Sequence, residues 1–349
     1  MPVNEIKHFV SRRKAAKFTT GTRRVLMKPD CLLLKPLPQK AREALGHAFS
    51  VHEMWLADDP AALVSRLGAQ CRFVVASGGA PCKADLIDQL PKLEIVGNFG
   101  VGYDSVDTAA CAKRGIVVTN TPDVLNDEVA DTTIALLLGA IRRMPQADAF
   151  VRAGKWPGGN FPLTGTLIGK RVGILGFGRI GQTIAKRLSG FNIAGISYHA
   201  RSAKAGLPFR YYGNLTEMAA DSDVLIVITP GGAATHHLVS RDVIEALGPQ
   251  GCLVNVARGP VVDETALIDC LKTGKLGSAG LDVFEFEPKV PAELMALDNV
   301  ALAPHVGSAT TYTRDAMGML VVDNLISWKE GKGPLTPVPE TPVPPRTGR

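Results

Sequence analysis

A glycine-rich turn between an apolar run and a helical pattern constrains the fold of this chain more than any other feature. The run Arg171–Leu175 leads directly into Gly176-Phe177-Gly178-Arg179-Ile180-Gly181. In a βαβ unit with this spacing, the first glycine permits a sharp turn, the second lets backbone N–H groups approach a pyrophosphate, and the third lets the helix pack close to the strand. A helical pattern and a further apolar run follow, so the context that the motif needs is present. The sequence therefore predicts a dinucleotide site at the N-terminus of a helix.

The end of the next apolar run indicates which dinucleotide is bound. A site for NAD would place Asp or Glu about 20 residues after the glycines, where it holds the ribose 2′-hydroxyl. Here the run ends in His199-Ala200-Arg201-Ser202, which contains no acid. Arg201 and Ser202 can both donate hydrogen bonds to a 2′-phosphate. We therefore predict NADP(H) as the cofactor; the alternative is that Arg201 is a surface residue without a role.

Apolar runs alternate with helical patterns on both sides of a long helix expected at 126–143. Continuous apolar runs favour parallel strands that are covered on both faces. Strands are expected at Arg24–Lys28, Arg72–Ala76, Leu93–Asn98, Ile116–Asn120, Arg171–Leu175, Ile193–Tyr198, Val224–Ile228, Gly251–Val256, Leu276–Asp282 and Asn299–Leu302. Other helices are expected at Pro38–Leu45, Lys83–Leu90, Arg179–Ser189, Arg241–Leu247 and Asp263–Thr273. This order predicts an α/β protein of two domains with a cleft between them.

Net charge and tail composition exclude several classes of protein. The net charge is +6, and residues 1–24 carry seven basic residues against one acidic residue, so the rest of the chain sums to zero. A nucleic-acid-binding body would carry a basic excess of its own, so we expect no nucleic-acid partner. The arm 1–21 is interpreted as disordered, with contact to nucleic acid or to an organelle import machinery as the alternative. Six prolines in residues 334–349 predict an extended tail.

The lengths of the apolar runs, the cysteines and the histidines predict where the protein resides and whether it binds a membrane or a metal. No apolar run approaches the roughly 18 residues of a membrane helix, so no membrane partner is expected. The six cysteines form no CxxC pair, and in a chain of this length they are read as reduced thiols of a cytoplasmic protein. The tandem His236-His237 has no Cys or carboxylate at ligand spacing in the sequence, so no metal site is predicted.

Three segments place polar residues just beyond expected strands, at the edge where active sites of α/β proteins form. They contribute Arg258, then Asp282 and Glu287, then His305. An arginine, an acid and a histidine at one sheet edge can bind a carboxylate, tune an imidazole and transfer a proton. Taken singly, Arg258 could instead form a domain-interface salt bridge, Glu287 could be a solvated acid and His305 a core histidine.

The segments GFGRIG, NVARGPVVDETAL, AGLDVFEFEP and PHVGSAT resemble the signatures of the D-isomer-specific 2-hydroxyacid dehydrogenases, in particular the NADPH-dependent glyoxylate/hydroxypyruvate reductases. The resemblance covers roughly 24–332. It implies two Rossmann-like domains with parallel sheets: a flavodoxin-like substrate domain at 22–122, completed by 309–333, and an NADP-binding domain at 123–308. It also implies a homodimer.

Site residues follow from the resemblance position by position. The catalytic residues match Arg258, Glu287 and the acid/base His305. The substrate carboxylate is expected on backbone N–H groups of Val101 and Gly102, with Arg258 and His305 also contacting substrate. Besides the glycine-rich turn, Arg201 and Ser202, the expected cofactor contacts are Thr229, Pro230, Thr235, Val256, Ala257, Asp282, Gly307 and Ser308.

The resemblance predicts reduction of small 2-keto acids, glyoxylate to glycolate and hydroxypyruvate to D-glycerate, by hydride transfer with His305 as the general acid. The segment 76–80 has no large side chain, which favours a short substrate. Two alternatives stay open. One is a related dehydrogenase for another 2-keto acid, or for phosphoglycerate with NAD. The other, of a different class, is an NAD(P)-sensing scaffold similar to the transcriptional corepressors that share this fold.

Overall fold

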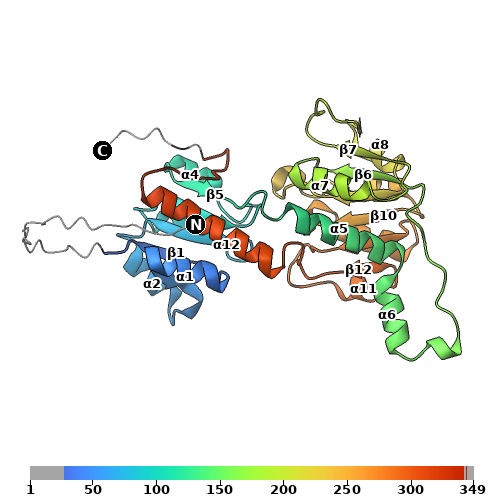
Figure 1. Cartoon of the computed structure of the whole chain (residues 1–349), viewed down its shortest axis with the longest axis horizontal. Coiled ribbons are helices and arrows are strands. Elements are labelled where there is room, and N and C mark those ends of the chain that lie inside the picture. Colours follow the sequence, from blue (N-terminus) through green and yellow to red (C-terminus); the bar gives the residue numbers. More distant parts are fainter. Residues whose placement is uncertain (1–26, 342, 344–349) are drawn as a thin grey trace, which may run out of the picture.

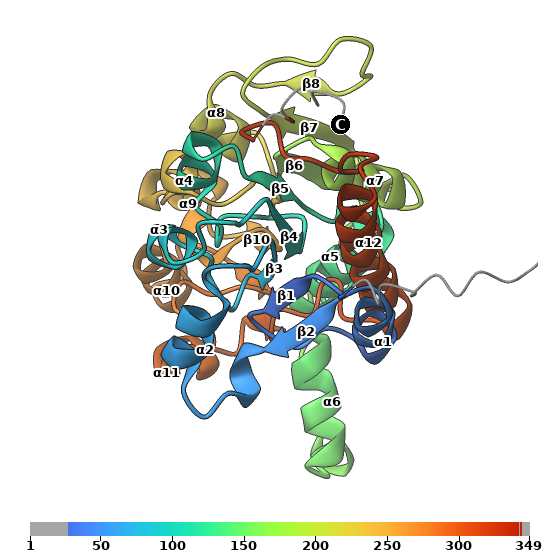
Figure 2. The same cartoon turned by 90° about the vertical axis from the view of Figure 1, so that its left-hand side faces the viewer.

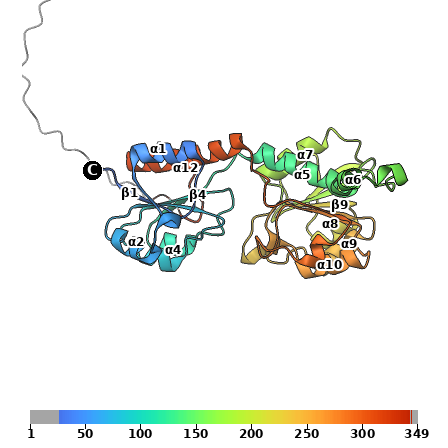
Figure 3. The same cartoon turned by 90° about the horizontal axis from the view of Figure 1, so that it is seen from below.

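The computed structural model describes residues 27–341 and 343, which form two α/β units. Figures 1 and 3 show the two units side by side, with the long helices α5 (Asn126–Ile141) and α12 (Thr311–Lys329) at their junction. The predicted disordered arm 1–21 lies outside the described residues.

The first unit is built on a five-stranded parallel sheet in the order β2-β1-β3-β4-β5. This is the strand order of flavodoxin-like folds, as expected from the resemblance. Its elements are β1 (Asp30–Leu33), α1 (Gln39–Ala48), β2 (Ser50–Glu53), the 3-10 helix η1 (Met54–Leu56), α2 (Pro60–Leu67), β3 (Phe73–Ser77), α3 (Ala84–Asp88), β4 (Ile95–Phe99), α4 (Thr108–Lys113) and β5 (Val117–Thr119).

The first strand does not lie where the sequence analysis expects it. The run Arg24–Lys28 is not a strand in its described part, and Met27 is 90% exposed. β1 begins after Pro29, and Cys31, Leu32 and Leu33 are fully buried. Proline has no backbone N–H to donate to a ladder and stands outside central strands, so the second apolar run, after Pro29, forms the strand.

The second unit is built on a seven-stranded parallel sheet in the order β12-β11-β10-β9-β6-β7-β8. Counted from β6, the order 3-2-1-4-5-6 of the dinucleotide-binding Rossmann fold is present, with one further strand. Its elements besides α5 are α6 (Met144–Arg152), η2 (Trp156–Gly158), β6 (Arg171–Leu175), α7 (Arg179–Leu188), β7 (Gly195–His199), β8 (Arg210–Tyr211), α8 (Leu215–Ala220), β9 (Val224–Val227), η3 (Ala233–Thr235), α9 (Arg241–Leu247), β10 (Cys252–Asn255), η4 (Gly259–Val261), α10 (Glu264–Lys272), β11 (Ser278–Leu281), α11 (Ala292–Met295) and β12 (Val300–Leu302).

Both sheets are covered on both faces, which is why their strands read as continuous apolar runs. Each sheet separates two hydrophobic clusters of buried residues. Helix α12 packs against α1 and β4 of the first unit. Its Val321, Val322 and Leu325 share a cluster with Phe73 and Ile95 of that unit's sheet. The chain therefore returns to the first unit after it has completed the second.

The start of the proline-rich segment, for which the sequence predicts an extended tail, packs on the first unit; residues 342 and 344–349 of that segment lie outside the described residues. Val338 is 2% exposed, and its N–H donates to the Val118 carbonyl at 2.9 Å. In return, the Val118 N–H donates to Thr341 Oγ1 at 2.9 Å. Residues 336–341 thus cover the free edge of β5. Prolines at alternate positions are compatible with such an edge, because only the intervening residues donate to it.

None of the helices in the described part of the chain has the length and apolarity to cross a membrane. All six cysteines are buried and outside any disulfide. Burial raises the pKa of the Cys82 thiol to about 12, so this thiol stays protonated and unreactive at neutral pH.

Candidate active site

The glycine-rich turn between β6 and α7 has the close contacts that its sequence predicts. Gly176 has φ +94°, and a Cβ there would lie 2.6 Å from the Ile228 carbonyl oxygen. A Cβ on Gly181 would collide with the Gly176 carbonyl. Around Gly178, in contrast, the space is open. The turn therefore packs tightly against the sheet on one side and leaves its backbone accessible on the other, which fits a pyrophosphate at the start of α7.

The residues expected at a 2′-phosphate lie directly after β7. Arg201 and Ser202 are exposed, and the Arg201 guanidinium forms no ion pair with any described residue. At the strand end, His199 Nδ1 is engaged by a 2.9 Å hydrogen bond with the Tyr212 carbonyl. Arg179 is already engaged, since its Nε lies 3.1 Å from Asp123 Oδ1. Of these side chains, Arg201 is therefore the cation with free donors.

His305 and Glu287 form a hydrogen-bonded pair between the loops that follow β12 and β11. His305 Nδ1 lies 2.7 Å from Glu287 Oε2, and the Phe284 N–H donates to Glu287 Oε1 at 3.1 Å. Burial alone would raise the pKa of Glu287, but the hydrogen bond and charge of His305, the Phe284 N–H and Arg258 outweigh it and hold the pKa below its usual value. An ionised Glu287 accepts the Nδ1 proton, which leaves His305 Nε2 without a partner among the described residues and available to a substrate.

The backbone of His305 lies in the left-handed region, with φ 55°. This conformation costs a non-glycine residue about 1 kcal/mol, and hydrogen bonds to Asp282 maintain it. The Asp282 carbonyl accepts from the His305 N–H at 2.8 Å, and its carboxylate accepts from Val306 and Gly307 N–H at 2.7 and 2.8 Å. Asp282 is 2% exposed, and burial raises its pKa despite these bonds. Asp282 therefore positions the loop that carries His305.

Arg258 follows β10 and lies between glycines of both units. Its Nη1 donates to the Ala257 carbonyl at 2.7 Å and its Nε to Asp104 Oδ1 at 3.2 Å. A Cβ on Gly102 would collide with the guanidinium, and a Cβ on Gly231 would lie 2.8 Å from Arg258 Cγ. Both positions must therefore be glycine for the arginine to reach the loop after β4.

The carbonyls of the loop after β4 accept hydrogen bonds from two asparagine side chains. Asn98 Nδ2 donates to the carbonyls of Gly100 and Gly102 at 3.1 and 3.0 Å, and Asn120 Nδ2 donates to the Val101 carbonyl at 2.8 Å. The N–H groups of Val101 and Gly102 donate to no described residue. Backbone N–H groups arranged in this way form a binding site for an anion. Sequence reasoning missed Asn98 and Asn120 as supports, although a polar residue at the end of the apolar strand β4 is a signal that could have identified one of them.

The remaining predicted cofactor residues lie at the carboxyl end of the second sheet. Thr229 and Pro230 follow β9, Val256 and Ala257 follow β10, and Gly307 and Ser308 follow β12. Thr235 Oγ1 donates to the Pro230 carbonyl at 2.8 Å and so closes the loop after β9. The sheet topology therefore brings these residues to the same edge as the glycine-rich turn.

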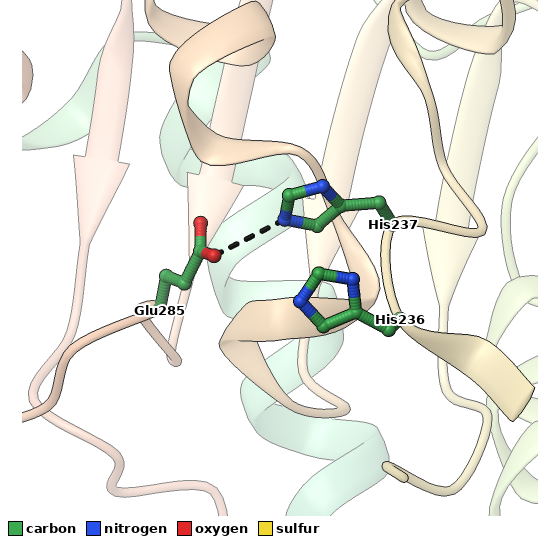
Figure 4. A group of neighbouring side chains, drawn as sticks. All are labelled: His236, His237 and Glu285. Carbon is green, nitrogen blue, oxygen red and sulfur yellow. Dashed lines mark hydrogen bonds and ion pairs between the residues drawn. The ribbon is translucent and has the colours of Figure 1, made fainter. Parts of the chain in front are cut away.

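The structure places a carboxylate next to the tandem histidines. Glu285, 48 residues away in sequence, places Oε1 3.1 Å from His237 Nε2. Figure 4 shows both imidazoles on the same side of this carboxylate. Ligand spacing along the chain does not reveal this carboxylate, because the sheet brings Glu285 to the same edge from a distant part of the sequence.

These features define a two-domain nicotinamide-dependent dehydrogenase. They are two units with parallel sheets, a dinucleotide turn, and an arginine and a histidine–glutamate pair at the strand ends. Residues 134–307 match the model of the D-isomer specific 2-hydroxyacid dehydrogenase NAD binding domain. The chain belongs to this family of dehydrogenases.

Similar proteins extend the match over most of the chain. Hydroxyphenylpyruvate reductase of Plectranthus scutellarioides is 47% identical over 307 residues, which cover 88% of this chain and 98% of that protein. Glyoxylate/hydroxypyruvate reductase A of Arabidopsis thaliana is 46% identical with the same coverage of both chains. Among solved structures, the NADPH-dependent glyoxylate/hydroxypyruvate reductase of Sinorhizobium meliloti, in complex with NADP and malonate, is 46% identical with a TM-score of 0.85, covering 92% of this chain and 99% of its own.

Proposed function

We propose that the chain is an NADPH-dependent reductase of short 2-keto acids, which converts glyoxylate to glycolate and hydroxypyruvate to D-glycerate. The observation that carries this proposal is the placement of Arg258 and the free N–H groups of Val101 and Gly102 against one another, with the His305–Glu287 pair on the neighbouring strand ends. Names of the similar proteins support the substrate class.

Each residue of the site has its own role in the reduction. Val101 and Gly102 N–H groups hold the substrate carboxylate, and the planar guanidinium of Arg258 bridges that carboxylate and the keto oxygen. When bound, the reduced nicotinamide supplies the hydride. Arg258 stabilises the negative charge that develops on the keto oxygen. His305 Nε2 then gives its proton to this oxygen, while ionised Glu287 stabilises the positive charge of the imidazolium and fixes the ring.

An aromatic 2-keto acid is the second candidate substrate, because one similar protein is a hydroxyphenylpyruvate reductase. The glyoxylate/hydroxypyruvate reductases among the similar proteins favour the shorter substrates, whereas the turn after β3, with only small side chains and open space around Gly78, leaves room for either. We expect kcat/KM with NADPH to be highest for glyoxylate or hydroxypyruvate. A higher kcat/KM for 4-hydroxyphenylpyruvate in the same panel would establish the aromatic alternative.

NADPH selectivity is assigned to Arg201. Replacing Arg201 with Ala removes a charge-assisted hydrogen bond to the 2′-phosphate, which is worth about 1.5–3 kcal/mol. We expect KM for NADPH to rise roughly 10–100-fold, with KM for NADH nearly unchanged. Arg210→Ala, an exposed arginine on β8 in the same unit, is the matched control. An equal increase in KM for NADPH and NADH in Arg201→Ala would show that Arg201 does not contact the 2′-phosphate.

We further propose that the enzyme is a cytoplasmic homodimer whose second copy packs on the arm 144–168. The arm projects from the second unit in Figure 2, where α6 extends away from the other helices. It exposes large apolar side chains: Met144, Val151, Trp156, Leu163 and Ile168 are 56, 55, 64, 100 and 69% exposed. Several large apolar side chains exposed on one projecting segment are typical of a protein interface.

The double variant Trp156→Glu, Leu163→Glu tests the dimer. In sedimentation equilibrium we expect a dimer for the wild type and a monomer for the variant, because each charge would have to be buried at the interface. A wild-type monomer at micromolar concentration, or a variant that stays dimeric, would show that this arm does not form the proposed interface.

A further inference from the structure

The tandem histidines and Glu285 lie outside the residues that the reduction uses. His236 and His237 follow η3 on the loop after β9, and Glu285 lies on the loop after β11. One ligand atom from each of the three residues lies within 4.8 Å of the other two. In Figure 4, each imidazole has a ring nitrogen on the side that faces the Glu285 carboxylate.

Neighbouring residues in an extended segment point to opposite faces, and here the backbone prevents this. His237 has φ 49°, in the left-handed region that a histidine rarely adopts. As a result, the two imidazoles stack with their centroids 4.0 Å apart and their planes inclined by 26°. The His237 N–H donates to the Pro260 carbonyl at 2.8 Å, which holds this turn in place.

Glu285 is held equally firmly beneath the imidazoles. Its side chain is 15% exposed, and its backbone N–H donates to Glu264 Oε2 at 3.1 Å. Glu264 is itself 7% exposed, so two carboxylates lie in a poorly solvated region. The bond from the Glu285 N–H and the 3.1 Å contact of its Oε1 with His237 Nε2 together hold Glu285 toward the imidazoles.

We propose that His236, His237 and Glu285 form a binding site for a transition-metal ion of the Zn²⁺ class. Two imidazole nitrogens and one carboxylate oxygen are a ligand set that Zn²⁺ accepts, whereas Mg²⁺ and Ca²⁺ prefer oxygen ligands throughout. Exposed His236 leaves room for a solvent molecule as the fourth ligand. The site is independent of the reductase function proposed above.

The distances agree with this assignment. Bonds of about 2.0–2.2 Å to Zn²⁺ place the ligand atoms of a tetrahedral site about 3.4 Å apart. His237 Nε2 and Glu285 Oε1 are already 3.1 Å apart. The His236 side chain is exposed and hydrogen-bonded to no described residue. Since its ligand atom lies within 4.8 Å of the other two, it would have to move by at most about 1.4 Å, within reach of a rotation about its side-chain bonds.

The ion would connect two loops of the active site. Glu285 precedes Glu287 by two residues, and the carbonyl that holds His237 belongs to Pro260, two residues after Arg258. Binding of Zn²⁺ to the folded chain therefore stabilises it by mass action, and we expect a higher melting temperature when Zn²⁺ is present.

The test uses the full chain without an affinity tag, dialysed against chelator and titrated with ZnCl2 by calorimetry. We expect one saturable site, and binding at least about tenfold weaker in His236→Ala and Glu285→Gln, because loss of a ligand should cost no less than the 10–100-fold of an outer-shell change. His47→Ala, an exposed histidine on α1, should bind as the wild type does, and MgCl2 should not bind.

Melting curves separate a lost ligand from a damaged fold. Exposed His236 forms no hydrogen bond to a described residue and would lose its stacking on His237, so His236→Ala should melt close to the wild-type temperature without Zn²⁺ and lack the increase with Zn²⁺. The proposal is overturned if the wild type shows no saturable binding up to 100-fold molar excess of Zn²⁺. It is also overturned if His236→Ala and Glu285→Gln bind Zn²⁺ as tightly as the wild type, since the ion would then lie elsewhere.

Discussion

Replacing His305 with Asn is expected to lower kcat for glyoxylate reduction by about 10²–10⁴-fold, the usual contribution of a positioned general acid. Asparagine is the appropriate substitution because it tolerates the left-handed backbone that His305 adopts at φ 55°. Its amide can also donate to Glu287 in place of Nδ1. The loop held by Asp282 should therefore survive, and only the transferable proton is lost.

Stopped-flow rates of NADPH oxidation measure this loss, and fluorescence titration shows whether NADPH still binds. We expect the Kd for NADPH to stay within about twofold, because the imidazole acts on the substrate oxygen. Glu287→Gln keeps the hydrogen bond but removes the charge, so its kcat should fall less than that of His305→Asn. If His305→Asn retained kcat within threefold of wild type, His305 would have no role in proton transfer.

Arg258→Lys is the second substitution with a large expected effect. Lysine keeps the positive charge, but it lacks the planar fork that spans a carboxylate and the adjacent keto oxygen. It also cannot reproduce the contacts of Nε to Asp104 and Nη1 to the Ala257 carbonyl. We expect kcat/KM for glyoxylate to fall by about 10²–10³-fold, the cost of removing a donor at a developing oxyanion.

The matched control is Arg66→Lys, on the exposed face of α2 in the first unit. It makes the same chemical change away from the site and should leave kcat/KM unaltered. If kcat/KM for glyoxylate fell by less than about threefold in Arg258→Lys, positive charge alone would suffice at this position. The bidentate arrangement would then be dispensable.

Local sequence patterns were sufficient to predict the dinucleotide turn. Strand β6 occupies the predicted residues, and α7 ends one residue before the predicted Ser189. As the spacing predicts, Gly181 packs against Gly176 within this βαβ unit and Gly178 leaves open space, whereas Gly176 also meets the backbone of Ile228 at the end of β9. The first strand was misplaced because two apolar runs flank Pro29, and the buried run could not be chosen without the rest of the sheet.

Features that depend on distant residues could not be predicted from the sequence. Helix α12, nineteen residues long, was not foreseen, since its apolar residues do not follow a single stripe. Asp104 meets Arg258 across 154 residues, and Glu340 of the proline-rich segment accepts a hydrogen bond from Tyr103 across 237 residues. The topology of the two sheets brings these residues together, and no local sequence pattern indicates such pairs.

The most direct test of the central claim is the decrease of NADPH absorbance with glyoxylate and hydroxypyruvate, repeated with NADH under the same conditions. The arrangement of Arg258, His305 and Arg201 predicts rapid oxidation of NADPH with both acids and kcat/KM for NADPH at least about tenfold above that for NADH. Equal rates with NADH would contradict the assignment of Arg201 to a 2′-phosphate. Turnover below ~1 s⁻¹ with every short 2-keto acid, against the usual range for enzymes, would contradict the proposed reduction itself.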